Sequence, residues 1–64
     1  MNIVLNGEMA LVTGPTLSDA LVELGYEGKF ATAVNETFVP VGARVAYQLK
    51  DGDRIEIVAP KQGG

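Results

Sequence analysis

The chain has 64 residues and contains no cysteine, histidine or tryptophan. A chain of this size forms one domain and buries only roughly 60% of its unfolded surface, so it has no room for a second domain or a deep pocket. Disulfides and the usual nitrogen and sulfur ligands of zinc are excluded. The core must therefore come from packing alone, for which the 47% hydrophobic content is sufficient.

The formal net charge is −3, and the five basic residues are scattered along the chain. Nucleic-acid binding depends on clustered lysine and arginine, so we expect no nucleic-acid partner. An acidic balance suits both solubility and steering onto a basic partner. The first residues have no basic segment, and the apolar run 3–5 is too short for a signal peptide or a membrane span. We therefore expect a cytoplasmic protein without membrane contact.

The first twelve residues predict a β-hairpin. Residues 1–6 alternate, with Ile3 and Leu5 on one face and Val4 on the other, which is the period of a strand. Asn6 and Gly7 are a strong signal for a type I′ turn, because this turn requires positive φ at both central residues. A second strand over residues 8–12 should fold straight back.

A short helix is predicted after the break at residues 13–15. Apolar residues recur at helical spacing over residues 17–24 and form one stripe: Leu17, Ala20, Leu21 and Leu24. Thr16 is a good N-cap, Asp19 lies in the first turn, and Gly25 can end the helix in a left-handed conformation. A helix this short must pack against the rest of the domain to exist.

The middle of the chain predicts a strand over residues 30–35, a turn, and a short edge strand that Pro40 closes. Residues 41–49 fit a helix and a strand equally well, so no structure is assigned to them. Asp51 and Asp53 flank Gly52; they resemble part of a calcium loop, but no acidic residue follows at the closing position. A tight turn explains both aspartates.

Residues 54–59 are the clearest strand, with Ile55 and Ile57 inward and Arg54, Glu56 and Val58 outward. The order of elements predicts an α+β fold in which one helix packs across a mixed sheet of four to five strands. The last strand can enter the centre of that sheet beside the first. We expect a domain over residues 1–59 and an exposed tail over residues 60–64 that ends in Gly-Gly.

The sequence offers no catalytic set, because nucleophilic catalysis needs a base beside the nucleophile and the only serine, Ser18, falls in the predicted helix. We therefore expect no enzyme and no metal site. Two terminal glycines arise by chance about once in 200 chains at the usual glycine frequency of about 7%. An extended Gly-Gly can enter a channel too narrow for other residues. Its carboxylate is ionised at neutral pH and can attack the α-phosphate of ATP held by another protein.

Four segments together resemble the ThiS family, the ubiquitin-like sulfur carriers of thiamine biosynthesis: residues 6–8 (Asn-Gly-Glu), residues 33–40 (Ala-Val-Asn-Glu-Thr-Phe-Val-Pro), residues 49–58 (Leu-Lys-Asp-Gly-Asp-Arg-Ile-Glu-Ile-Val) and Gly63-Gly64. The resemblance covers nearly the whole chain. One departure is Val41, which follows Pro40 where the family often has a basic residue; the nearest basic residue is Arg44.

The resemblance implies a β-grasp fold and a reaction cycle on the tail. The E1-like adenylyltransferase ThiF would activate the Gly64 carboxylate with ATP and magnesium, and Gly63 would provide clearance. Sulfur from a cysteine desulfurase or another persulfide donor would give a thiocarboxylate, and the thiazole synthase ThiG would receive it. The carrier would bind no cofactor of its own and would be a monomer when free.

Three alternatives remain open. The small subunit of molybdopterin synthase has the same tail chemistry and another acceptor, although such carriers generally run longer. A β-grasp interaction module would carry an incidental Gly-Gly, and a protein modifier would be conjugated to lysine. If the helix covers the face that bears Ile3, Leu5, Ile55 and Ile57, Val4 and Val58 should point outward beside Ala33 or Thr32 and, with Phe38, form a surface on which the partner docks.

Overall fold

The structure is a computed structural model that describes residues 1–59. Its elements in chain order are β1 (Asn2–Leu5), β2 (Glu8–Leu11), α1 (Leu17–Glu23), β3 (Ala31–Val34), β4 (Thr37–Val39), the 3₁₀ helix η1 (Val41–Ala43) and β5 (Arg54–Val58). Gly63 and Gly64, and the whole predicted tail, lie outside the described residues. No helix within residues 1–59 is long and apolar enough to cross a membrane.

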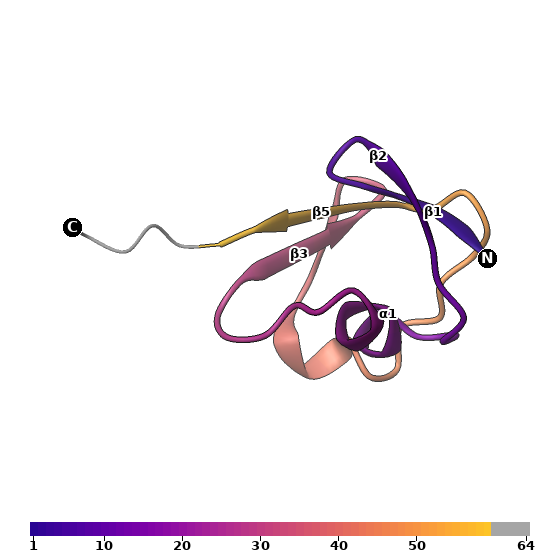
Figure 1. Ribbon diagram of the computed structural model, residues 1–64. Coiled ribbons are helices and arrows are strands. Elements are labelled where there is room, and N and C mark those ends of the chain that lie inside the picture. Colours follow the sequence, from indigo (N-terminus) through magenta and orange to yellow (C-terminus); the bar gives the residue numbers. More distant parts are fainter. Residues whose placement is uncertain (60–64) are drawn as a thin grey trace.

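The five strands form one mixed sheet in the order β2-β1-β5-β3-β4. The central pair β1 and β5 is parallel, and the other neighbouring strands are antiparallel. Figure 1 shows α1 lying on one side of this sheet while β5 runs through its middle. The predicted α+β architecture, with the last strand beside the first, is confirmed, and it is the β-grasp fold.

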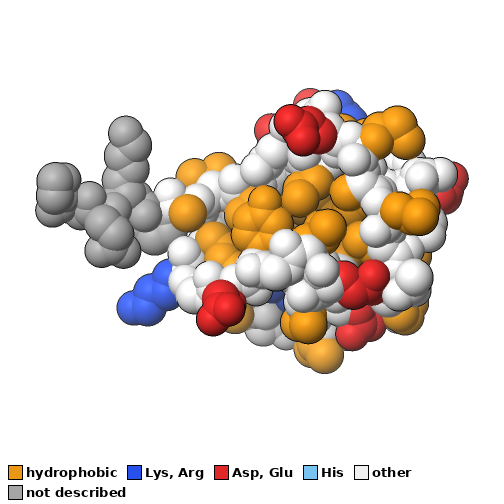
Figure 2. All heavy atoms as spheres, viewed as in Figure 1, with side chains coloured by type: hydrophobic (Ala, Val, Ile, Leu, Met, Phe, Trp, Pro, Cys, Tyr) orange, Lys and Arg blue, Asp and Glu red, His pale blue; other side chains and the backbone are white. Residues whose placement is uncertain are grey.

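The core lies between the helix and the inner face of the sheet. Its largest fully buried hydrophobic side chains are Ile3, Leu17, Ile55, Val12 and Val34. The predicted inward residues Leu5 and Ile57 also pack against this core but remain partly exposed. The inner surface is therefore not closed on every side, and Figure 2 shows hydrophobic side chains across the middle of one face of the molecule.

The helix begins where the sequence predicts it. The Thr16 hydroxyl accepts a hydrogen bond from the backbone N–H of Asp19 at 3.1 Å, and the Asp19 carboxylate accepts one from the N–H of Thr16 at 3.4 Å. This reciprocal capping box satisfies two N–H groups that a helix start otherwise leaves unpaired. Leu24 is the C-cap, so the helix is one residue shorter than predicted, and Gly25 follows with φ +83°.

Residues 41–49 form neither a regular α-helix nor a strand. They contain η1, further turns and a single bridge between Gln48 and Thr16. Long-range backbone hydrogen bonds hold the segment; in one of them the N–H of Leu49 donates to the carbonyl of Pro15 at 2.8 Å. Arg44 fastens the same segment to β3: its guanidinium donates to the Phe30 carbonyl at 2.6 Å and to the Thr32 hydroxyl at 3.1 Å. It also lies 4.5 Å from the centre of the Phe30 ring.

Candidate functional site

The last strand is held at its C-terminal end by a side chain from the first turn. The backbone N–H of Asn6 donates to the carbonyl of Ile55 at 2.9 Å. At Ile57 the side-chain amide of Asn6 replaces a backbone partner: its Oδ1 accepts from the N–H of Ile57 at 2.9 Å, and its Nδ2 donates to the Ile57 carbonyl at 3.4 Å. On the other side of β5, Val58 pairs with Ala31. Both sides of β5 are thus bonded almost to its end.

A second asparagine holds the beginning of the same strand. Asn35 donates its backbone N–H to the carbonyl of Arg54 at 2.7 Å, and its Oδ1 accepts from the N–H of Arg54 at 3.0 Å. Its Nδ2 donates to the buried carboxylate of Asp53 at 2.9 Å. β5 is therefore fixed at both ends by side-chain amides from the two neighbouring hairpin turns.

The sequence indicated a turn at Asn6 and the end of a strand at Asn35, and neither set of contacts was predicted from it. Both have positive φ, at 48° and 50°. Asparagine is unusual in tolerating this conformation while carrying an amide that can both donate and accept, as a peptide group does. The signal available in the sequence was an asparagine opening each of the two tight turns.

The turn interpretation of Asp51 and Asp53 is confirmed. Asp51 Oδ1 accepts from the N–H of Asn2 at 2.7 Å, and Asp53 Oδ2 accepts from the N–H of Lys50 at 2.8 Å. Gly52 between them has φ +89°. Both carboxylates are thus used to hold the turn that leads into β5.

The outer face of the sheet carries the residues predicted to dock a partner. Val58 is 66% exposed, Phe38 is 65% exposed and Val4 is partly exposed. The prediction that Thr32 is their neighbour on this face is wrong. Thr32 is only 1% exposed, and its hydroxyl donates to the carbonyl of Val39 at 2.9 Å. The small outward residue is Ala33, which is opposite both Phe38 and Glu56.

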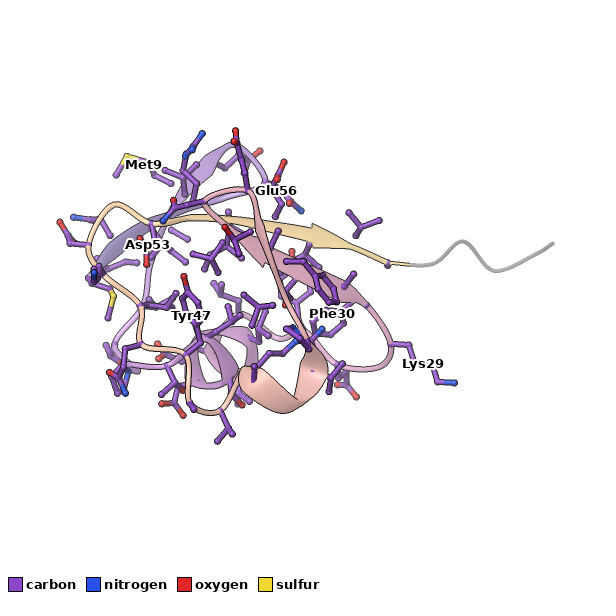
Figure 3. All side chains as sticks on the ribbon, turned by 180° about the vertical axis from the view of Figure 1, so that it is seen from behind. Met9, Lys29, Phe30, Tyr47, Asp53 and Glu56 are labelled. Atoms are coloured by element: carbon purple, nitrogen blue, oxygen red, sulfur yellow. The ribbon has the colours of Figure 1, made fainter. Side chains whose placement is uncertain are left out.

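Val4 and Val58 do not form one continuous apolar patch. The register sets Val4 opposite Arg54, four residues before Val58 on β5, with Glu56 between them on the same face. Met9 pairs with Val4 and is 73% exposed, so it adds an apolar side chain that was not expected from the sequence. Figure 3 shows Met9 and Glu56 projecting from the side of the sheet that faces away from the helix. The face is therefore a charged centre with apolar residues around it.

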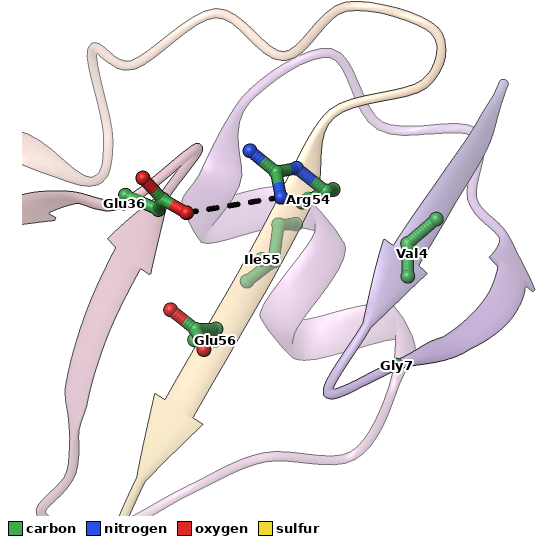
Figure 4. A pocket seen from close by; sticks show the side chains of 6 residues that line it. All are labelled: Val4, Gly7, Glu36, Arg54, Ile55 and Glu56. Carbon is green, nitrogen blue, oxygen red and sulfur yellow. Dashed lines mark ion pairs between the residues drawn. The ribbon is translucent and has the colours of Figure 1, made fainter.

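A shallow hollow of about 200 Å³ lies in this charged centre. It is lined by Val4, Gly7, Glu36, Arg54, Ile55 and Glu56 (Figure 4). Arg54 forms an ion pair with Glu36 at 3.9 Å, and both side chains are largely exposed. Small-molecule sites usually measure about 300–1,000 Å³, and this lining contains no nucleophile with a base. The hollow suits contact with another protein better than catalysis.

Comparison with known proteins decides the family. The model of the ThiS family matches residues 3–64. The chain belongs to the ThiS family. It is 39% identical, over 61 residues, to the sulfur carrier protein ThiS of Thermus thermophilus, and the match covers 94% of this chain and 95% of that protein. The crystal structure of the thiamine biosynthesis protein ThiS from Geobacter metallireducens superposes with a TM-score of 0.83 at 26% identity, covering both chains completely.

Proposed function

We propose that this ThiS-family protein is a sulfur carrier of thiamine biosynthesis that reacts at the carboxylate of Gly64. The observation that carries the proposal is the family match, which extends to residue 64. The structure supports it through β5, whose backbone is paired as far as Ile57 on the side of Asn6 and as far as Val58 on the side of β3. The segment that ends in Gly63-Gly64 follows directly. A strand held in this way fixes the point from which a reactive tail extends into a partner.

The protein needs an activating partner, because its own residues offer no group that activates a carboxylate. In an E1-like adenylyltransferase such as ThiF, with ATP and magnesium, the Gly64 carboxylate attacks the α-phosphate and releases pyrophosphate. A persulfide sulfur, derived from a cysteine desulfurase, then displaces AMP to give an acyl disulfide. Attack by a partner thiol on this disulfide releases the thiocarboxylate. A thiazole synthase such as ThiG receives the sulfur.

The two C-terminal glycines have different roles in this cycle. Gly64 carries the reacting carboxylate, and Gly63 lets the backbone pass through a narrow channel because it has no Cβ. ATP and magnesium belong to the partner, and the carrier itself holds no cofactor. We place this cycle in the cytoplasm, where ATP for the activation is present.

The outer face of the sheet is the docking surface for the activating enzyme. Val4, Val58 and Phe38 present apolar area there, with Met9 beside Val4. Partner interfaces enrich aromatic residues and methionine in their apolar parts. Val58 is the last residue of β5, so an enzyme that contacts it is placed close to the start of the tail.

The mass of the intact chain tests the proposal. The full chain is incubated with ATP, magnesium, an E1-like enzyme and a persulfide donor. We expect a gain equal to the replacement of one oxygen by sulfur. The gain should be lost when Gly64 is deleted and kept in the control Gly42→Ala, whose added Cβ meets no atom within 4 Å. No mass gain in the full chain would contradict the proposal.

The same experiment separates the alternatives. A molybdopterin-synthase subunit would gain the same mass but would deliver its sulfur to a molybdopterin precursor and not to thiazole synthase. An interaction module would gain no mass, and its partner binding would survive deletion of Gly64. A protein modifier would appear in cell extracts as a ladder of conjugates of higher mass.

A further inference from the structure

The hollow in the outer face of the sheet has an excess of negative charge. Two glutamates, Glu36 and Glu56, and one arginine, Arg54, line it. The single ion pair, between Arg54 and Glu36, is 3.9 Å long, with side chains that are 60% and 77% exposed. Exposed pairs of this kind contribute about 0–1 kcal/mol. Within residues 1–59, the Glu56 carboxylate has no hydrogen bond or ion pair, so one negative charge in the hollow has no protein partner there.

Apart from the charged residues Arg54 and Glu36, the neighbours of Glu56 on this face are apolar. Its neighbour across to β3 is Ala33, and the next residue outward is Phe38. Val58 lies two residues further along β5, and Val4 forms the opposite wall of the hollow (Figure 4). Glu56 is exposed, and its neighbour Ala33 has a small side chain. The acidic group is therefore accompanied by three apolar residues, called the rim: Val4 in the lining, and Phe38 and Val58 further out on the same face.

The size of the hollow restricts what can fill it. About 200 Å³ is less than small-molecule sites usually offer, and it accommodates a single long side chain. The ligand must be positively charged, because the sum of the three charges in the lining is −1. Docked apolar residues would exclude water from the hollow, and a charge pair in a medium of lower dielectric constant is stronger than an exposed one.

We propose that this hollow receives one arginine or lysine side chain of the adenylating partner, which pairs with Glu56 while apolar residues around that cation contact the rim. The inference rests on the proposed function, because it specifies the partner surface that this carrier fits. Arg54 already balances one of the two glutamate charges, which leaves a charge of −1 for one incoming cation. An acidic partner surface would be repelled by this net negative charge, so the hollow favours a basic partner over an acidic one.

Affinity measurements with the full chain test this inference. The probe is the purified adenylating enzyme without a sulfur donor, titrated calorimetrically at low and high salt. Glu56→Gln should weaken binding by about tenfold or more, since loss of one partner of a desolvated charge pair is costly, and should flatten the salt dependence. Glu56→Lys should weaken it further by repulsion. The control Glu27→Gln makes the same charge change in the groove beside α1 and should bind as the unmodified chain does.

The outcomes separate this inference from the proposed function. Equal affinity and equal salt dependence for Glu56→Gln would overturn the inference, and thermal unfolding of each variant shows that the fold is intact. The mass gain at Gly64 is measured separately at saturating enzyme. If Glu56→Gln still gains sulfur there while its affinity is reduced, the inference and the function both stand. If sedimentation shows a dimer of the free chain that Glu56→Gln dissociates, the cation belongs to a second copy and the partner assignment is wrong.

Discussion

The side-chain amide of Asn6 pairs with the backbone of Ile57, 51 residues further along the chain. The amide occupies the place of a strand residue, because β1 ends at Leu5 and Asn6 has already turned with φ 48°. It continues the hydrogen bonding of the parallel pair β1 and β5 by one residue. The end of β5 in this carrier is therefore held by a turn residue from the other end of the sequence.

Asn6→Gly should loosen the end of β5. Glycine keeps the left-handed turn, so the change removes the amide and its two hydrogen bonds to Ile57, which corresponds to about 1–2 kcal/mol of unfolding free energy. We expect this loss in urea unfolding and faster hydrogen exchange of the Ile57 amide. Asn6→Asp is the matched control, because its Oδ1 can still accept from Ile57. Unchanged exchange of Ile57 in Asn6→Gly would show that the amide does not hold the strand.

Val58→Asp should impair activation while leaving the fold intact. Val58 is 66% exposed, so the substitution removes little core packing, but it places a charge in the proposed docking surface. We expect kcat/KM for adenylation to fall by about tenfold, equivalent to about 1.4 kcal/mol. Val45→Asp is the control, because Val45 is 69% exposed and lines the groove beside α1. Equal rates for the two variants would remove Val58 from the docking surface.

Glu23 makes stability depend on pH. The backbone N–H groups of Thr13 and Gly14 donate to its carboxylate and hold its pKa below the ordinary value of 4.5. A lowered pKa in the folded state means that the stabilisation is complete above 4.5 and is lost as the pH falls through the folded value. Thermal unfolding of Glu23→Gln and of the unmodified chain should therefore differ at neutral pH and converge in acid. A difference that stays constant down to pH 3 would contradict this account.

Glycine is required at position 14 for reasons of space. A Cβ there would overlap the Cβ of Asp19 and lie 2.9 Å from Glu23 Oε2. Gly14→Ala must shift the start of α1 or the Glu23 contact, and we expect a loss of about 1–3 kcal/mol in unfolding free energy, as for other overpacked sites. Gly42→Ala meets no atom within 4 Å and should change stability by less than about 0.5 kcal/mol. If both variants unfold alike, the crowding at Gly14 is relieved without cost.

Local signals in the sequence predicted much of the fold. The Asn6-Gly7 turn, the Thr16 cap and the apolar stripe of α1 depend on residues within a few positions of one another, and the structure confirms each. The same kind of signal was ambiguous in residues 41–49, which fitted a helix and a strand equally well. Val41 and Val45 are spaced as in a helix, yet both are exposed, and only Leu49 of that series is buried.

The structure of residues 41–49 could not be predicted because distant partners hold this segment, as in the contacts of Arg44 with Phe30 and Thr32. No local pattern reports contacts of that kind.

The sequence by itself determined where the turns and the helix form, which residues of β5 face inward, and the family of sulfur carriers to which the chain belongs. The tertiary structure decided the register of the sheet, because pairing Val4 with Arg54 joins residues 50 positions apart. That register separates Val4 from Val58 and places the Glu56 carboxylate between them. It also brings Asn6 to Ile57, so the hold on the last strand exists only once the two ends of the chain lie side by side.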